Sequence, residues 1–308
     1  MPMPSFRILL PILLLATSIP ANVPRDDFSG VSRELKLRLV EEINHDRRAG
    51  GLRPVEFSDE LSMAADAHCR EMLTENYTSH WNRAGWKPYM RYSAAGVRDF
   101  TEENIFSLWR TNLDTSEASL GKEMLGGHRG FLAERPPYDG HRRSILSPRP
   151  THVGIGLAFD AQGMRLIEVF SARYAQLEPL PQRVTLRDTL SVTGRVADRN
   201  LRLFGVAIYY EPLPRPMASL DLRRTHSYSL PEEHQMERLW HGEAQYIDGS
   251  QGSILVNDTG KFSLGLRFWK KLPGVYTIGV WVSEKSGRDA FLGALESVFV
   301  EEGKKGGR

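Results

Sequence analysis

The spacing of apolar residues changes part-way along this chain, and that change limits the folds open to it. In the first half, apolar residues recur at helical spacing, as at Leu35 and Leu39. Beyond residues 177–182, which contain two prolines and are typical of a linker, apolar and polar residues alternate as they do in strands. A chain of 308 residues is long enough for two domains, each with its own core. We therefore expect an α+β fold class, with a mixed domain over residues 31–176 and an all-β domain over residues 183–301.

Helix and strand signals divide the first domain into helices that flank a sheet. Ser58 is suited to cap a helix, and another helix is expected over residues 116–133. Residues 153–159 and 164–170 predict two strands joined by a turn. The segment over residues 81–102, which lies between these two helices in the sequence, is expected to be irregular. Helices on both sides of a short antiparallel sheet predict a three-layer α-β-α sandwich.

Turn residues separate short alternating segments in the second domain. They fall at residues 198–200, 257–260 and 272–274, and the strongest strand pattern covers residues 275–282. Several short strands joined by turns predict a β-sandwich of roughly immunoglobulin-like size. The tail over residues 302–308 is rich in glycine and charge, and we expect it to be disordered.

The N-terminal residues have the composition of an export signal. Arg7 precedes an apolar run over residues 8–15 that is too short to cross a bilayer comfortably, and residues 18–21 offer a small-residue cleavage site. We expect residues 1–22 to be a cleaved signal peptide, with an uncleaved membrane anchor as the alternative. Cleavage would place the protein outside the cell or in the periplasm, with no integral membrane span.

The net charge and the number of cysteines limit the partners and the covalent cross-links that this chain can have. The formal net charge of +2 gives no basic field of the kind that nucleic acids attract. The single cysteine, Cys69, excludes an intramolecular disulfide, and its place in a helical pattern predicts a buried, unreactive thiol.

Four short motifs in the first domain each carry a histidine or a glutamate. They are Ser-His-Trp at residues 79–81, Glu-Asn-Ile at 103–105, Ala-Glu-Arg-Pro-Pro-Tyr at 133–138 and Gly-His-Arg at 140–142. In order and spacing these motifs resemble the CAP superfamily, which groups cysteine-rich secretory proteins, antigen 5 and plant pathogenesis-related proteins with many bacterial exported proteins. The resemblance covers residues 31–176 and implies a three-layer fold. It also implies an ion-binding tetrad of His80, Glu103, Glu134 and His141, and the lack of disulfides suggests a bacterial form.

The residue types of this tetrad suit a divalent cation, and zinc is the expected ion. Two neutral imidazoles are good zinc ligands, and two carboxylates can either complete the shell or orient the imidazoles. The alternative is that each glutamate only hydrogen-bonds a histidine to hold helices and loops together. Glu102 stands where the family typically has glycine, which leaves open a different backbone turn at that point.

Further residues near the tetrad are candidates to line a ligand cleft, namely Trp81, Arg142, Arg143 and His152. The two arginines, with Arg149, either receive an anionic group or are loop charges paired with nearby carboxylates. We interpret His152 as a surface residue rather than a fifth polar group of the site.

The remaining aromatic and histidine residues of this domain have structural interpretations. The aromatic residues at positions 81, 86, 89 and 92 either line a groove or form a small core that fixes their loop, and we favour the small core. His45, His68 and His128 lie on expected helices and are predicted to be partly buried packing residues.

Three functions remain open at this stage. The first is a non-enzymatic binding module that holds a divalent metal and a small lipid or peptidic ligand in the adjoining cleft. The second is a metal-assisted extracellular hydrolase, with Glu103 or Glu134 as general base, although the chain lacks the His-Glu-x-x-His helix motif and a serine in a nucleophile elbow. The third is a cell-surface adhesion or cell-wall protein that binds a surface partner through the β-domain.

Overall fold

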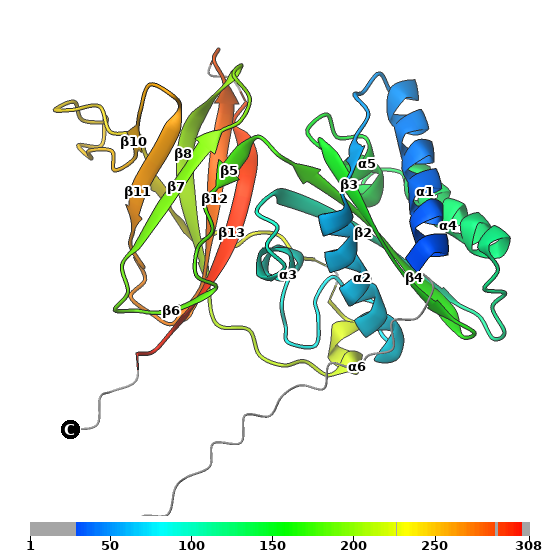
Figure 1. Cartoon of the computed structure of the whole chain (residues 1–308). Helices are drawn as coiled ribbons and strands as arrows, with labels where there is room; N and C mark the ends of the chain where they lie inside the picture. Colours follow the sequence, from blue (N-terminus) through cyan, green and yellow to red (C-terminus); the bar gives the residue numbers. More distant parts are fainter. Residues whose placement is uncertain (1–28, 226, 287–288, 304–308) are drawn as a thin grey trace, which may run out of the picture.

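The computed structural model describes residues 29–225, 227–286 and 289–303 (Figure 1). The expected signal peptide and residues 304–308 of the expected disordered tail lie outside these ranges. Among the described residues, no helix has the length and apolar character needed to cross a membrane. Two bodies of different composition lie side by side in Figure 1, a mixed domain followed by a sandwich of two sheets.

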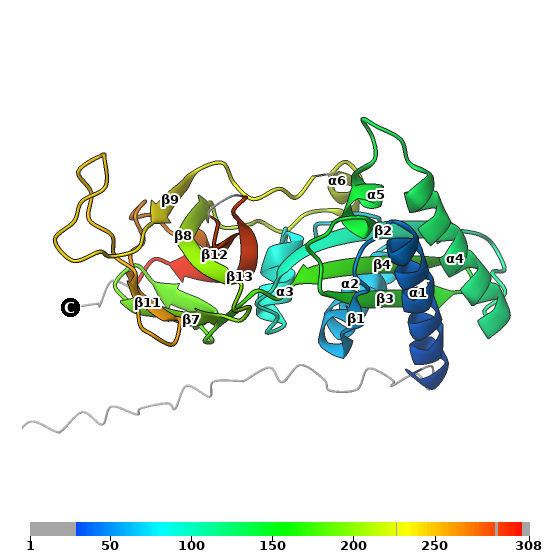
Figure 2. The same ribbon diagram turned by 90° about the horizontal axis from the view of Figure 1, so that it is seen from above.

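The N-terminal domain has three layers around one sheet, as the sequence predicts. The sheet has the order β1-β3-β4-β2, formed by Glu56–Phe57, His152–Asp160, Gly163–Ala172 and Phe100–Trp109. One face is covered by α1 (Ser29–Ala49), α4 (Glu117–Ala133) and α5 (Gly140–Ile145), whose apolar side chains share one buried cluster with β3 and β4. The other face is covered by α2 (Asp59–Thr74) and α3 (Pro88–Ala94). Figure 2 shows the helices on both sides of the sheet.

Helix α2 lies unusually close to the sheet because two glycines of β3 face it. A Cβ atom on Gly154 would lie 2.4 Å from Cβ of Leu61, and one on Gly156 would lie 2.6 Å from the backbone of Ala65. Ser58 caps this helix, as predicted, by accepting a hydrogen bond from the backbone N–H of Leu61. Cys69, on the same helix, is fully buried as expected.

The C-terminal domain is a β-sandwich, as predicted. One sheet has the order β10-β11-β7-β5, formed by Leu255–Val256, Lys261–Leu266, Leu190–Val196 and Ala175–Leu177. The other has the order β6-β13-β12-β8-β9, formed by Arg183–Thr185, Phe291–Glu301, Gly274–Glu284, Leu201–Glu211 and His234–Glu237. Because β5 pairs with β7, residues 175–177 belong to the sandwich. The connection between the domains therefore does not coincide with the linker over residues 177–182 that the sequence indicated.

Residues 212–225 and 227–233, between β8 and β9, leave the sandwich and return to the N-terminal domain. We call them the β8–β9 excursion. Its short helix α6 (Ser219–Leu222) lies beside the end of α2 in Figure 1, and Leu222 is fully buried in the cluster that α2 forms with the sheet. Arg223 donates to the backbone oxygen of Asn76, at the end of α2, over 3.2 Å. The expectation that residues 183–301 form only a sandwich is thus wrong for this segment.

The two domains also share a buried core of their own. Tyr89 and Met90 of α3 pack with Leu295 and Phe299 of β13, and the ring of Trp86 lies 4.9 Å from that of Phe299. Of the four aromatic residues in the segment that was expected to be irregular, Trp86 and Tyr89 lie in this shared core, while Trp81 and Tyr92 pack in the cluster formed by α2. Residues 88–94 of that segment are helical. The domain junction is therefore a packed interface.

Candidate functional site

The four tetrad residues line one open cleft of about 960 Å³ at the edge of the first sheet. His80 lies in the loop after α2, and Glu103 lies on β2, the edge strand. Glu134 directly follows the last residue of α4, and His141 lies in the first turn of α5. Arg47 of α1 holds the end of α5 by donating to the backbone oxygens of Ile145 and Ser147 at 2.6 and 2.9 Å.

Glu103 is fully engaged by protein groups. Its side chain is completely buried, and its carboxylate accepts hydrogen bonds from Nδ1 of His80 at 3.0 Å, from Nη2 of Arg91 at 3.0 and 2.9 Å, and from the hydroxyl of Tyr92 at 2.7 Å. Burial alone would raise the pKa of Glu103, but the Arg91 guanidinium and the hydrogen bond from His80 outweigh it and hold that pKa well below its usual range. The carboxylate is therefore ionised and can only accept.

The second pair repeats this arrangement nearer the solvent. Oε1 of Glu134 lies 2.5 Å from Nδ1 of His141, and Oε2 accepts the backbone N–H of His141 at 3.0 Å. The ring of Phe131 lies 4.6 Å from the imidazole of His141, and the side-chain amide of Asn104 on β2 donates to the backbone oxygen of His141 at 3.2 Å. The histidine is thus fixed from three sides.

In both pairs the carboxylate holds Nδ1, which leaves Nε2 of the neutral imidazole with its lone pair. A carboxylate that binds the other ring nitrogen is the usual way in which proteins fix the tautomer of a metal-ligating histidine. Among the described residues, no group of three or more His, Cys, Asp or Glu side chains is arranged to hold one ion. The geometry thus matches imidazole ligands oriented by carboxylates, rather than a shell of four protein ligands.

The N-terminal domain is similar in sequence to known proteins. Residues 40–174 match the family model of the CAP domain, described as the cysteine-rich secretory protein family. The N-terminal domain belongs to the CAP superfamily. The chain is 29% identical over 142 residues to the Bacillus subtilis (strain 168) protein named "Uncharacterized protein YkwD", a match that covers 46% of this chain and 49% of the relative. The chain thus spans about half the length of the curated relative it matches.

Three solved structures were also found to be similar. An extracellular protein with an SCP domain from Bacillus anthracis str. Ames has a TM-score of 0.36 and 18% identity, over 46% of this chain and 41% of that one. An outer surface protein of Borrelia burgdorferi has a TM-score of 0.38 and 15% identity, over 48% and 96%. A cysteine-rich secretory protein of Staphylococcus aureus subsp. aureus Mu50 has a TM-score of 0.31 and 15% identity, over 46% and 39%.

Tyr228, from the β8–β9 excursion, completes the cleft of the CAP domain. Its hydroxyl accepts the backbone N–H of Glu103 at 2.7 Å and donates to the backbone oxygen of Glu103 at 3.3 Å, so it pairs the exposed edge of β2. Its ring lies 4.5 Å from the imidazole of His80. Burial raises the pKa of Tyr228, which keeps the hydroxyl protonated. No pattern in the sequence near Tyr228 indicates a contact with Glu103.

The predicted cleft residues divide into two groups. Arg142 and Arg143 line the cleft; Arg142 donates to the backbone oxygen of Leu132 at 2.6 Å, and Arg143 lies 3.2 Å from Asp139. Trp81 does not line the cleft, because its indole N–H donates to the backbone of the excursion at 2.8 Å. Arg149 is also elsewhere, with its guanidinium 3.9 Å from the ring centroid of Phe291 in the sandwich.

The positions of the remaining histidines and of Glu102 can be compared with their predicted roles. His152 lies on β3 and is not among the residues that line the cleft, so its assignment to the ligand cleft is wrong. Its side chain is 20% exposed, with Nδ1 2.8 Å from the hydroxyl of Thr151. Glu102 occupies a regular position of β2 opposite Phe170, so no different turn forms there. His68 and His128 are buried as expected, but His45 is exposed.

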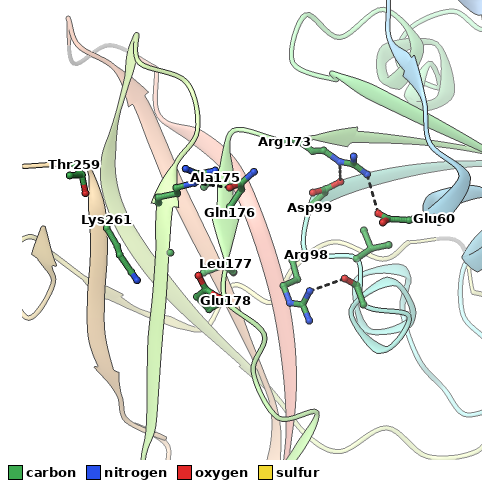
Figure 3. Close-up of a pocket in the computed structure, with 14 residues that line it drawn as sticks. Glu60, Arg98, Asp99, Arg173, Ala175, Gln176, Leu177, Glu178, Thr259 and Lys261 are labelled. Carbon is green, nitrogen blue, oxygen red and sulfur yellow. Dashed lines mark hydrogen bonds and ion pairs between the residues drawn. The ribbon is translucent and has the colours of Figure 1, made fainter. Parts of the chain in front are cut away.

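A second cavity of about 780 Å³ lies between the domains, away from the tetrad (Figure 3). Several of its charged side chains are already paired. Arg173 lies 2.6 Å from Asp99 and 3.6 Å from Glu60, and Arg98 lies 3.0 Å from Glu296 across the domain junction. Of these ion pairs only Arg98–Glu296 joins the two domains, and the cavity contains none of the tetrad residues.

Proposed function

We propose that this chain is an exported CAP-domain protein that binds a divalent transition metal, with zinc as the expected ion, through Nε2 of His80 and Nε2 of His141. The observation that carries the proposal is the repeated orientation: each imidazole gives Nδ1 to a carboxylate and lines the same cleft. Two imidazoles suit zinc, and a site with two protein ligands leaves positions open for water or a ligand.

A metal held there would supply a Lewis acid at the mouth of the cleft, and the protein groups around it favour an anionic partner. Arg142 and Arg143 line the same wall as His141. A carboxylate or phosphate of a small peptidic or lipid ligand could accept hydrogen bonds from these guanidinium groups. We therefore propose ligand binding beside the metal as the activity of the cleft.

The hydrolase alternative receives less support from the same contacts. A general base needs a free lone pair directed at water. Both carboxylate oxygens of Glu103 accept hydrogen bonds within the buried cluster, and both oxygens of Glu134 are bonded to His141. We therefore assign these carboxylates to positioning the imidazoles.

The proposal is tested by metal content and titration. Elemental analysis of the purified exported protein should detect zinc, and the metal-free protein should bind zinc in a calorimetric titration. The double variant H80A/H141A should lose this binding, while H152A is a matched control elsewhere on the same sheet and should keep it. Undiminished zinc binding by a folded H80A/H141A variant would show that the metal assignment is wrong.

Two glutamine variants test the orienting role separately. E103Q and E134Q should each weaken zinc binding by about 10-fold to 100-fold, which is the usual effect of removing a carboxylate that orients a ligand.

Export is tested by the intact mass of the protein outside the cytoplasm, which should lack residues 1 to about 21. A mass that includes Met1 would contradict cleavage.

A further inference from the structure

A third cavity, of about 600 Å³, lies under the β8–β9 excursion at the junction of the two domains. Residues 227–232 of the excursion form one wall, and β13 forms another through Leu292 and Leu295. The cavity adjoins the His/Glu cleft, because Glu102 and Tyr228 line both. The cavity is therefore formed only when the β8–β9 excursion lies against the CAP domain.

The walls of this cavity combine aromatic rings with carboxylates. Five of the lining residues are tyrosine, phenylalanine or tryptophan, namely Tyr89, Phe100, Tyr209, Tyr228 and Trp281. Glu102 and Glu232 also line it, and none of the described lining residues is a lysine or an arginine. Lys87, which lies near the ring of Tyr89, is paired with Glu211 at 2.7 Å. His234 also lines the cavity, with its Nδ1 2.8 Å from the backbone oxygen of Glu232. Aromatic faces and carboxylates with no lysine or arginine among them attract an organic cation.

Two polar groups of the cavity make no hydrogen bond within the described part of the chain. Glu102 is half-buried, and its carboxylate makes no hydrogen bond or ion pair within the described part of the chain. Burial raises its pKa, while the Arg143 guanidinium acts in the opposite direction. Thr101 is only 6% exposed, and its hydroxyl also has no partner among the described residues. Buried polar groups are normally hydrogen-bonded, so the Thr101 hydroxyl calls for a partner, and the half-buried Glu102 carboxylate can accept hydrogen bonds from a ligand.

We propose that this cavity binds a small amphiphilic cation, a protonated amine on an apolar body. The ammonium lies beside Glu102, where its N–H groups meet the unpaired carboxylate. The apolar body lies against Trp281 and Tyr209, whose side chains are linked by a hydrogen bond of 3.2 Å and so form one surface. A neutral apolar ligand would fill the same space but leave Glu102 without a partner. This inference goes beyond the metal site, because it uses none of the proposed ligands.

The test uses two probes of the same shape and different charge, 2-phenylethylammonium and 2-phenylethanol. Calorimetric titration of the full chain should give an affinity for the amine that is about tenfold higher than for the alcohol, the scale of a desolvated cation contact. E102Q keeps the shape of the side chain and should bring the amine down to the affinity of the alcohol. E178Q removes the same charge from an exposed residue of the other interdomain cavity and should change neither affinity.

The outcomes separate this site from the metal site. H80A/H141A should still bind the amine, and E102Q should still bind zinc, so each proposal can fail alone. Equal affinities for the amine and the alcohol, no detectable binding of the amine, or an unchanged amine affinity in E102Q would overturn the proposal. E102D, which retains the charge, should bind the amine better than E102Q does and so excludes a general loss of folding as the cause.

Discussion

The buried leucine of α6 gives the sharpest test of how the two domains are joined. Leu222 is fully buried in the cluster that α2 and the sheet form in the CAP domain. Its replacement by alanine removes three carbon atoms, worth about 2.4 kcal/mol at about 0.8 kcal/mol per buried methylene group. The residual cavity adds to this loss, so we expect L222A to reduce the free energy of unfolding by about 3 kcal/mol.

The same helix offers a matched control. Leu220 is two positions away and 60% exposed, so L220A should change the free energy of unfolding by less than about 0.5 kcal/mol. Urea denaturation followed by tryptophan fluorescence would measure both variants. Limited proteolysis should then cut the β8–β9 excursion faster in L222A than in L220A, because α6 loses its anchor in the CAP domain.

L222A should also affect the proposed metal site through Tyr228, which follows α6 on the excursion and contacts Glu103 and His80. L222A should therefore weaken zinc binding, whereas L220A should not. The reasoning fails if L222A costs less than about 1 kcal/mol, well below the usual range for a buried leucine. It fails equally if proteases cut the excursion readily in the unchanged protein.

Three further perturbations follow from buried groups. E103A should cost about 3–5 kcal/mol in urea denaturation, because it leaves the buried Arg91 guanidinium without its counter-ion, and E103Q should cost less. Burial would lower the pKa of His128, but hydrogen bonds to its two carboxylate partners raise it. Its contribution to stability is thus full below the ordinary histidine pKa and lost as pH rises through the raised one, so H128Q should be more damaging at pH 6 than at pH 9. G154A should lower the thermal midpoint, because the added methyl group meets α2 at Leu61.

The local elements of the CAP domain could be predicted because their signals are local. Ser58 caps α2 as expected, since a capping side chain acts within three residues of itself. The helix expected over residues 116–133 forms as α4, and Ser116 is its cap. The strands around the 160–163 turn also formed as predicted. Helix α3 was missed because seven residues are too few to show a helical period. Pro88 is the first residue of that helix, a position where proline is well tolerated.

Strand β2 was harder to predict from the sequence because several of its buried residues are polar. Glu103 and Asn104 are both buried, so the strand lacks the apolar alternation that marks one. Its side chains are stabilised by Arg91 and Tyr92 from α3, a helix that the sequence did not predict either. The tetrad could be named from motif order alone, whereas the roles of its members depend on these contacts.

The β8–β9 excursion could not be predicted at all, and it changes how the site is understood. Tyr228 contacts Glu103 across 125 positions of sequence, and no pattern within either segment records such a pairing. Tyr228 lies between two strands of the sandwich along the chain, yet its side chain lines the cleft of the CAP domain. The cleft is therefore complete only when the two domains are packed together. A ligand that binds only the docked state must stabilise docking, by about 2.7 kcal/mol at a ligand concentration 100 times its dissociation constant. If the proposed metal binds at His80, its binding and the packing of the two domains would therefore be linked equilibria, even though the two imidazoles both lie in the CAP domain.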